Sequence, residues 1–385
     1  MNASFVTNGR IFDGEAFQDG MTVQIENGRI TEVSSRSPVS DGPVHDLDGR
    51  LLAPGFIDLQ VNGGGGVMFN DAPTVETLRT MAAAHRRFGS TGLLPTLISS
   101  TRETMHQAVE AVRTAIDEDV PGILGIHLEG PFLARERRGI HDEGKLRPIR
   151  EDDLDWLCSL NDFPVLLTIA PEAVGGDAIR RLAGAGLAVF AGHSMATCEQ
   201  TREALDAGLR GFTHLYNAMA PFTQREPGIV GAALEDRASY AGLIADGAHV
   251  HPAALAVAAA AKTPDRIVLV TDAMATVGAP GTSFDWDGQA VTVVDGSCRL
   301  PDGSLAGSNL DMLSAVRNAI RFMHIDLGQA LRMASANPAA AIGLDHELGH
   351  LRPGYRACLV ELDDALNLRG SWIDGRRFDA EGGEH

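Results

Sequence analysis

Residues able to bind a metal ion stand at the ends of separate apolar runs. Glu129, His193 and His214 each close one such run, and a carboxylate with two imidazoles can supply three ligands to a divalent metal. The fourth position then stays open for water, which is the pattern of a catalytic site. A metal held in this way acidifies its water and polarises a carbonyl oxygen. The chemistry indicated is metal-assisted hydrolysis.

A further carboxylate, Asp272, follows another apolar run and could take a proton from water and pass it to a leaving amine. Each of these residues has a structural alternative. A single histidine at a strand end is often only a hydrogen-bonded interior residue, and an aspartate there can cap a helix. Glu129, His193 and His214 taken together favour a site, whereas the helix-cap alternative for Asp272 stays open. His127 and His251 are interpreted as structural residues.

Two other patterns are set aside. Residues His346–His350 match HExxH, which binds zinc only when both histidines lie on one face of a helix. Glycines and Pro353 crowd this segment, so a sustained helix is not expected. The run Gly63–Gly66 lacks the spacing of phosphate-binding loops, and we predict a flexible loop there.

The elements that must position these residues follow a repeated order from about residue 51. Short apolar runs alternate with segments of helical spacing, which is typical of a (β/α)8 barrel. The runs are nearly continuously apolar, as expected for strands buried on both faces. Active sites of such barrels lie at the carboxyl ends of the strands. The predicted strands are Leu52–Val61, Gly92–Ile98, Ile123–Leu128, Pro164–Ile169, Ala188–Ala191, Gly211–His214, Tyr240–Ile244 and Arg266–Val270.

The two ends of the chain show a different pattern. Apolar and polar positions alternate in residues 1–49 and again in residues 355–378, within terminal parts taken as 1–50 and 346–385, with turn signals such as Asn27-Gly28 and Asp374-Gly375. This alternation indicates antiparallel strands with one face in water. We therefore predict an α/β fold in which a TIM-like (β/α)8 barrel, residues 51–345, carries a small β-sandwich built from both chain ends.

The composition excludes several classes of function. The chain of 385 residues has a formal net charge of −19, which argues against nucleic acid and against an anionic membrane surface. The first residues do not have the pattern of a secretory signal, and the longest apolar run, Ala253–Ala261, is too short to cross a bilayer. Four well-separated cysteines without CxxC spacing indicate free thiols, so we expect a cytoplasmic protein.

A series of short segments carries a resemblance to a known family. In chain order they are Pro54–Asp58, His127–Phe132, Gly192–Ser194, His214–Met219, Asp246–His249, Thr271–Ala273 and Leu305–Ser308. Over essentially its whole length the chain resembles the N-acetylglucosamine-6-phosphate deacetylases of the amidohydrolase superfamily. The strings HLEGP and HLYNAM are specific to these deacetylases, whereas PGFID marks only the superfamily.

The resemblance implies roles for particular residues. Glu129, His193 and His214 would bind the catalytic metal. Asp272 would act as general base and then acid, and His141 would help to polarise the acetyl carbonyl. The residues implied to contact the sugar phosphate are Ile140, Asn217, Ala218, Arg225, His249, Leu305, Ala306 and Gly307, with the last three placed in a loop.

The positive charge that a phosphate needs would come from two of these residues. Arg225 offers a forked donor suited to phosphate, and His249 can add another. The alternative for Arg225 is an ordinary solvated surface arginine.

At two places in the expected site this chain differs from the pattern that is common in the family. Many amidohydrolases carry His-x-His after the first strand and bind two metals, whereas this chain has Gln60 and Asn62, which are poor metal ligands. We therefore expect one divalent ion per subunit, zinc first, with iron or another divalent ion as the alternative. Phe132 stands where tryptophan is common in the family, which bears on substrate fit.

The reaction implied is removal of acetate from N-acetyl-D-glucosamine 6-phosphate, giving D-glucosamine 6-phosphate, in amino-sugar catabolism. Alternatives within the same class are deacetylation of the galactosamine epimer or of an N-acyl amino acid. An alternative from another class is a barrel without activity that serves as a scaffold, but such proteins typically lose metal ligands. The implied partners are the phosphorylated sugar and further copies of the chain, in a homodimer or a higher homo-oligomer.

Overall fold

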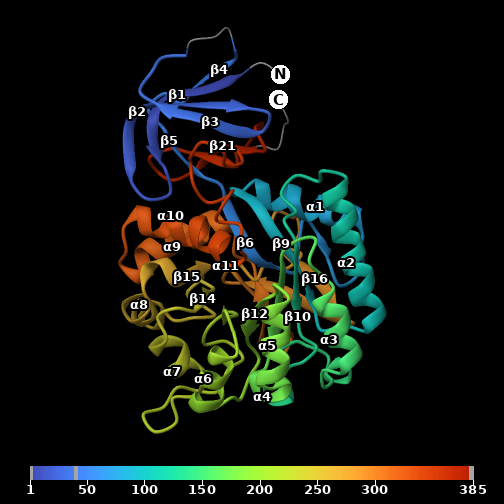
Figure 1. The fold of residues 1–385 in the computed structure, drawn as a ribbon. Coiled ribbons are helices and arrows are strands. Elements are labelled where there is room, and N and C mark those ends of the chain that lie inside the picture. The colour runs from blue at the N-terminus through green and yellow to red at the C-terminus, as the bar shows by residue number, and fades with distance from the viewer. Residues whose placement is uncertain (1–2, 39–41, 381–385) are drawn as a thin grey trace.

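A parallel barrel forms the centre of the protein in the computed structural model, which describes residues 3–38 and 42–380 (Figure 1). Eight parallel strands pair in chain order, and the barrel predicted from the apolar runs is confirmed. The strands are β6 (Phe56–Val61), β9 (Ser90–Ile98), β10 (Ile126–Glu129), β11 (Val165–Ile169), β12 (Ala188–Ala191), β13 (Gly211–Phe212), β14 (Tyr240–Leu243) and β15 (Ile267–Leu269).

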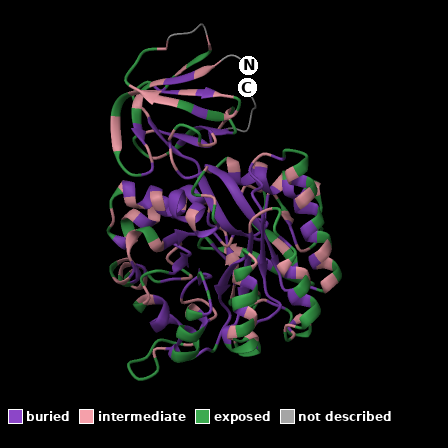
Figure 2. Cartoon of the chain, viewed as in Figure 1, coloured by how far each residue is buried: buried purple, intermediate pink, exposed green. Residues whose placement is uncertain are grey.

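Helices cover the outside of the barrel, and their inner faces are buried while their outer faces are exposed (Figure 2). Several begin at a threonine whose hydroxyl accepts a backbone N–H, as Thr74 and Thr101 do. The helices are α1 (Val75–Arg86), α2 (Arg102–Asp117), α3 (Glu151–Cys158), α4 (Pro171–Val174), α5 (Gly176–Gly184), α6 (Cys198–Asp206), α7 (Gly228–Glu235), α8 (Pro252–Ala261), α9 (Met312–Met323), α10 (Leu327–Ala334) and α11 (Ala336–Ala341).

The barrel closes between its first strand and the segment that follows its last strand. The backbone N–H of Asp272 donates to the carbonyl of Gln60 at 2.9 Å, and that of Asn62 donates to the carbonyl of Ala273 at 2.9 Å. Below this point the buried carboxylate of Asp58 accepts the backbone N–H of Thr271 at 3.2 Å. The closure therefore brings the end of β6 beside Asp272.

Strands from both ends of the chain lie in one sheet beside the barrel, drawn blue and red in Figure 1. This terminal sheet encloses an apolar cluster that includes Ile11, Leu52, Leu359 and Trp372. Its strands are, in sheet order, β22 (Arg376–Asp379), β21 (Leu368–Ile373), β20 (Leu359–Leu362), β5 (Leu51–Pro54), β1 (Ser4–Phe12), β2 (Phe17–Glu26) and β3 (Arg29–Ser34), with β4 (Val44–Asp46) paired to β1.

The strand predicted at 52–61 is divided into β5 and β6 at Gly55. A side chain at Gly55 would place its Cβ only 2.0 Å from Oγ1 of Thr91, so the chain passes very close to β9 where it enters the barrel. The residues before Gly55 pair in the terminal sheet and those after it pair in the barrel.

Two small elements correct the sequence predictions. The loop predicted at Gly63–Gly66 is a short hairpin of β7 (Gly63–Gly64) and β8 (Val67–Met68), in which Gly63 and Gly64 are buried while Gly66 at the turn is exposed. The loop predicted at Leu305–Gly307 is strand β19 (Leu305–Ser308). It belongs to an antiparallel sheet with β16 (Ser283–Trp286), β17 (Gln289–Val294) and β18 (Ser297–Arg299), which no sequence pattern had indicated.

Candidate active site

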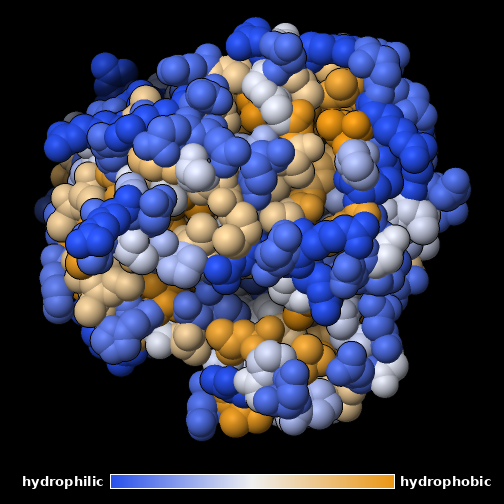
Figure 3. Space-filling view, turned by 90° about the horizontal axis from the view of Figure 1, so that it is seen from below, coloured by the Kyte–Doolittle hydropathy of each residue, from blue (hydrophilic) through white to orange (hydrophobic). Residues whose placement is uncertain are grey.

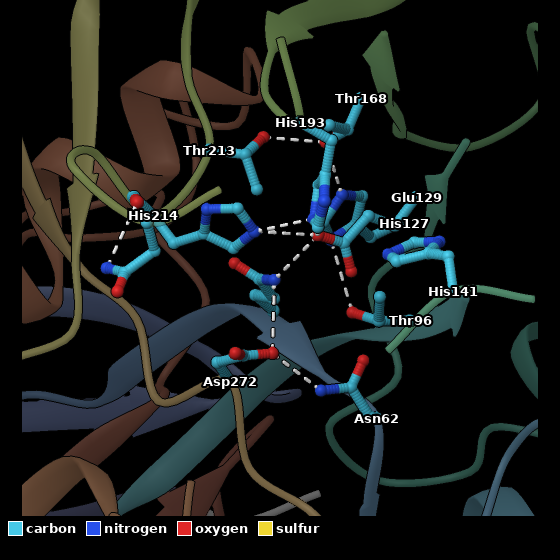
Figure 4. Close-up of polar contacts among 12 residues, drawn as sticks. Asn62, Thr96, His127, Glu129, His141, Thr168, His193, Thr213, His214 and Asp272 are labelled. Carbon is cyan, nitrogen blue, oxygen red and sulfur yellow. Dashed lines mark hydrogen bonds and ion pairs between the residues drawn. The ribbon is translucent and has the colours of Figure 1, made fainter. Parts of the chain in front are cut away.

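Three side chains from three barrel strands converge at the rim. Oε1 of Glu129, the last residue of β10, lies 3.0 Å from Nε2 of His193 and 2.9 Å from Nε2 of His214, which follow β12 and β13. The two imidazole nitrogens are 3.0 Å apart (Figure 4). All three residues are buried, and they form the one group among the described residues that could hold a metal through at least three ligands of these types.

The backbone at these strand ends turns sharply. His193, His214 and Asp272 have φ angles of 48°, 32° and 53°, in the left-handed region that residues other than glycine seldom adopt. Such a conformation costs of order 1–3 kcal/mol at each position and is concentrated at functional sites. Here each left-handed residue comes two or three residues after its strand ends, so its side chain projects over the end of the barrel.

The donor set fits a divalent cation. The backbone carbonyl of Arg137 accepts from Nδ1 of His193 at 2.8 Å, so with a metal bound the lone pair of this imidazole would lie on Nε2, the nitrogen that faces Glu129. Nδ1 of His214 is buried without a partner among the described residues. A carboxylate and two imidazole nitrogens meeting at one point, with one side open to a cavity, match the ligands of a mononuclear catalytic site.

The charges of the cluster depend on one another. Burial alone would raise the pKa of Glu129, but hydrogen bonds with the two histidines bring it well below its ordinary value. Burial would lower the pKa of His214, and the Glu129 carboxylate raises it above the ordinary histidine value instead. Glu129 therefore stays ionised, which is the form in which a carboxylate can bind a metal.

Asp272 lines the same cavity as the metal cluster of Glu129, His193 and His214. Its Oδ1 accepts from Nδ2 of Asn62 at 2.7 Å and from Nε2 of Gln60 at 3.1 Å. Burial and the negative charge of Glu129 raise the pKa of Asp272 above its usual range. A carboxyl group with a raised pKa is suited to accept a proton and release it again.

His141 contributes a hydrogen-bond donor to the same cavity. The backbone N–H of Ser99 donates to Nδ1 of His141 at 3.3 Å, and the Ser99 hydroxyl lies 2.7 Å from the same nitrogen. Because a backbone N–H can only donate, Nδ1 must carry the lone pair and the neutral ring carries its proton on Nε2. Burial, followed by the nearby His193, lowers the pKa of His141 well below its ordinary value, which keeps the ring neutral.

A cavity of about 160 Å³ opens at this end of the barrel and gathers most of the predicted site residues. The metal cluster, Asp272 and His141 form its inner part. The predicted substrate contacts that line it are Ile140, Asn217, Ala218, His249, Leu305 and Gly307. The surface opposite the terminal sheet is mostly hydrophilic and hollowed, with hydrophobic residues gathered around the depression (Figure 3).

Two predicted substrate contacts lie outside this cavity. Arg225 is exposed on the segment between β13 and α7, and Ala306 is fully buried within β19. The neighbours of Ala306, Leu305 and Gly307, line the cavity in its place, as expected for alternate residues of a strand.

Sequence reasoning missed several groups that support the site. Asp246 accepts Nδ1 of His249 with Oδ2 at 2.6 Å and two backbone N–H groups with Oδ1. The spacing of three residues between Asp246 and His249 could have indicated this contact, because side chains so close in a turn can reach one another. Ser99, by contrast, gives no sign in the sequence that it contacts His141.

The remaining histidines have structural surroundings. Both ring nitrogens of His127 face threonine hydroxyls, with Nε2 2.8 Å from Oγ1 of Thr168, and burial lowers the pKa of His127 to about 4. His251 caps α8 by accepting the N–H of Ala253. Residues 345–350, which include HExxH, form turns and bends.

The fold and the site together define a class of protein. A (β/α)8 barrel with a Glu/His/His metal cluster and an opposed aspartate at its rim is a metal-dependent hydrolase of the amidohydrolase type. The model of the Amidohydrolase family matches residues 51–377, and the chain belongs to that family.

Relatives with curated names narrow the comparison. The chain is 46% identical to N-acetylgalactosamine-6-phosphate deacetylase of Shewanella sp. (strain ANA-3), over 92% of this chain and 90% of that protein. It is 36% identical to N-acetylglucosamine-6-phosphate deacetylase of Haemophilus influenzae, over 91% and 93% respectively.

Solved structures agree in fold. The crystal structure of N-acetylglucosamine-6-phosphate deacetylase from Pasteurella multocida has a TM-score of 0.94 and 35% identity, with 98% of this chain and 100% of that chain covered. A mutant of the Mycobacterium smegmatis deacetylase in complex with N-acetyl-D-glucosamine-6-phosphate has a TM-score of 0.89 and 32% identity, with 97% and 99% covered.

Proposed function

We propose that this protein hydrolyses the acetamide of N-acetyl-D-glucosamine 6-phosphate to give D-glucosamine 6-phosphate and acetate. The observation that carries the proposal is the single cavity in which the Glu129, His193 and His214 cluster faces Asp272, with His141 beside them. Deacetylases of this kind from several organisms are related to the chain over most of its length. The reaction belongs to amino-sugar catabolism.

Glu129, His193 and His214 would hold the metal, which when bound supplies Lewis acidity for polarising the amide carbonyl and acidifying water. Asp272 takes a proton from the water that adds to the carbonyl carbon. His141 donates its Nε2 proton in a hydrogen bond to the carbonyl oxygen as negative charge develops there. Asp272 then passes its proton to the amine nitrogen as the C–N bond breaks, and acetate is released.

The phosphate end of the substrate would lie toward His249. This imidazole lines the cavity and is held by Asp246, so its outer nitrogen can face an anion. Asn217, Ala218, Ile140 and the strand β19 residues complete the sugar pocket in this proposal. Arg225 would join when its segment approaches a bound phosphate, either in the same chain or in a neighbouring copy.

We infer one metal ion per subunit because Gln60 and Asn62 direct amide groups toward carboxylates instead of offering ligands. Zinc suits a site of two imidazoles and one carboxylate, and iron or another divalent ion is the alternative. We also propose a homodimer or a higher homo-oligomer in the cytoplasm. No helix in the described part of the chain is long and apolar enough to span a membrane, and its four cysteines are unpaired.

The galactosamine epimer is the second candidate substrate. It is favoured by the 46% identity to the Shewanella protein named N-acetylgalactosamine-6-phosphate deacetylase, and a second such deacetylase, from Escherichia coli O157:H7, is 38% identical. Both candidates use the same metal cluster, base and phosphate contacts, and they differ only at one sugar hydroxyl.

These proposals are tested by measuring acetate release before and after chelation. The substrates are the 6-phosphates of N-acetylglucosamine and N-acetylgalactosamine, and unphosphorylated N-acetylglucosamine. We expect turnover of at least one phosphorylated sugar, loss with chelator and recovery with added zinc. A higher kcat/KM for the galactosamine compound would assign the chain to the second candidate. Turnover of none of the three by metal-loaded protein would refute the deacetylase assignment.

A further inference from the structure

We propose that Gln60 and Asn62 are positioning residues that hold Oδ1 of Asp272 as a fixed hydrogen-bond acceptor and so reserve Oδ2 for proton transfer. This inference rests on the proposed function, because it concerns the base of that reaction. It assigns a task to the two residues that stand where other amidohydrolases place metal-binding histidines.

The contacts converge on one oxygen. Nδ2 of Asn62 lies 2.7 Å from Oδ1 of Asp272 (Figure 4). Nε2 of Gln60 lies 3.1 Å from the same atom. The Gln60 amide also reaches Oε1 of Glu129 at 3.2 Å. Gln60 therefore uses its two N–H bonds on two carboxylates, one from the metal cluster and one from the base.

The orientation of both amides follows from the chemistry of their neighbours. An ionised carboxylate accepts hydrogen bonds and cannot donate them, so only the NH2 end of an amide can face it favourably. The opposite orientation would set an amide oxygen against Glu129 and Asp272. In this orientation Oδ1 of Asn62 has no partner among the described residues. The hydrogen bond from Nδ2 to Asp272 is therefore the interaction that accounts for an amide at this position.

The backbone fixes this arrangement. The N–H of Asp272 donates to the carbonyl of Gln60, and the N–H of Asn62 donates to the carbonyl of Ala273, both at 2.9 Å. Gln60 and Asn62 are 2% and 1% exposed, so neither amide can move into solvent. The side chains that meet Asp272 are therefore set by the hydrogen bonds that close the barrel.

The consequence concerns the proton. Oδ2 of Asp272 has no hydrogen bond to any described protein group, and Asp272 lines the cavity. With Oδ1 occupied by two donors, the proton removed from water adds to Oδ2 and leaves from Oδ2 to the amine. A base held in one orientation avoids the loss that misplacement brings, which can reach about 100-fold for an error of 1 Å.

The alternative is that the two amides only stabilise the barrel, and two variants separate these roles. Asn62→Leu removes the donor, and Asn62→Asp replaces it with a group that can donate only while it is protonated. Asn318→Asp, on the outer helix α9, is the control for an added negative charge. Each is measured for kcat and KM over pH 6–10, metal content and thermal unfolding.

We expect Asn62→Leu to lower kcat about 10- to 100-fold with KM and metal content near wild type, because misplacement of the base affects the chemical step. Asn62→Asp should lose kcat progressively toward alkaline pH, where two facing carboxylates would both be ionised, and Asn318→Asp should keep the wild-type profile. Should either Asn62 variant fail to fold, Gln60→Leu is judged by the same kcat and metal criteria.

Wild-type kcat and pH profile in the Asn62 variants, with or without a lower unfolding temperature, would overturn the inference and leave a purely structural role. Failure of the proposed function would look different: the wild-type protein with metal bound would show no turnover. In that case this inference would fall as well.

Discussion

Asp272 is the residue whose loss should separate metal binding from turnover. In Asp272→Asn the amide keeps the shape of the side chain but cannot accept a proton. We expect kcat to fall by about 10²- to 10⁴-fold, which is the usual contribution of a general base, while one metal per chain is retained. Steady-state kinetics with elemental analysis checks this, and near-normal turnover in the variant would assign the base elsewhere.

Asp246 should control the affinity for the phosphate through His249. Burial would raise the pKa of Asp246, but its hydrogen bond with His249 keeps it below the usual range, so a carboxylate faces the imidazole. Asp246→Asn removes the carboxylate that accepts Nδ1 of His249 and orients the ring toward the cavity. A hydrogen bond to a charged group contributes roughly 1.5–3 kcal/mol, so we expect KM for the phosphorylated sugar to rise at least about tenfold.

The unphosphorylated sugar is the internal control for that variant, because it lacks the group that His249 would contact. Its kcat/KM should be unchanged by Asp246→Asn. An equal loss for both sugars would mean that Asp246 supports the cavity as a whole and has no particular role in phosphate binding.

At the residue scale the sequence predicted that Glu129, His193 and His214 meet at one rim with Asp272, because each stands where an apolar run ends and a barrel brings all such ends together. The contacts of Gln60 and Asn62 could not be predicted. They join residues 210 and 212 positions apart in the chain, and they depend on the register at which β6 meets the segment after β15. Only the structure places Arg225 outside the cavity.

At the scale of elements, the hairpin β7–β8 shows how a glycine run can be rigid. Gly63 and Gly64 were predicted to be flexible, yet both are buried, and the carbonyl of Gly63 lies 2.8 Å from Nε2 of His85. Glycine is needed here for space, because a Cβ on Gly63 would lie 2.5 Å from the carbonyl oxygen of Val67 and 2.9 Å from the backbone nitrogen of Ala275. The sequence shows the glycines but not the backbone that surrounds them.

Gly63→Ala should therefore destabilise the fold by about 1–3 kcal/mol, the usual cost of overpacking. The matched control is Gly184→Ala at the end of α5, where a Cβ would meet nothing within 4 Å. Because alanine favours a helix over glycine, that control should be neutral or up to about 1 kcal/mol more stable. Denaturant unfolding measures the free energy of unfolding of both variants. Equal values would show that the hairpin backbone shifts to accommodate a Cβ at little cost.

The sheet β16–β19 was missed for a different physical reason. Its strands are only three to six residues long, and β17, the longest, has Val291 as its one buried residue, so the alternation of apolar and polar positions is weak. Even so, β19 supplies Leu305 and Gly307 to the cavity.

At the scale of the whole molecule, the two ends of the chain stabilise each other. Strand β20 pairs with β5, and its fully buried Glu361 accepts hydrogen bonds from residues of the N-terminal part. Nε2 of His45 and Nη1 of Arg50 each lie 2.8 Å from one of its carboxylate oxygens. Sequence alternation predicted strands at both ends, but it contains no information on which strands pair.

Glu361→Gln should loosen this connection. Burial would raise the pKa of Glu361, but hydrogen bonds from His45 and Arg50 outweigh it and lower the pKa below the ordinary value. A group with a depressed folded-state pKa contributes stability that is complete above its unfolded pKa of about 4.3 and is lost as pH falls through the folded pKa. At pH 7 we expect a loss of about 1.5–3 kcal/mol, because its partners His45, Arg50 and Arg377 are partly exposed and water can replace the carboxylate.

The pH dependence distinguishes this charge effect from a loss of packing. Denaturant unfolding followed by tryptophan fluorescence reports on the region, because Trp372 packs against His45 with ring centroids 5.2 Å apart. The stability difference between wild type and Glu361→Gln should shrink as the pH falls below about 4. Asp177→Asn, which breaks an exposed pair with Arg180, should stay within about 0.5 kcal/mol at every pH. If the stability difference between wild type and Glu361→Gln did not change with pH, packing of the side chain and not its charge would stabilise the contact between the two ends.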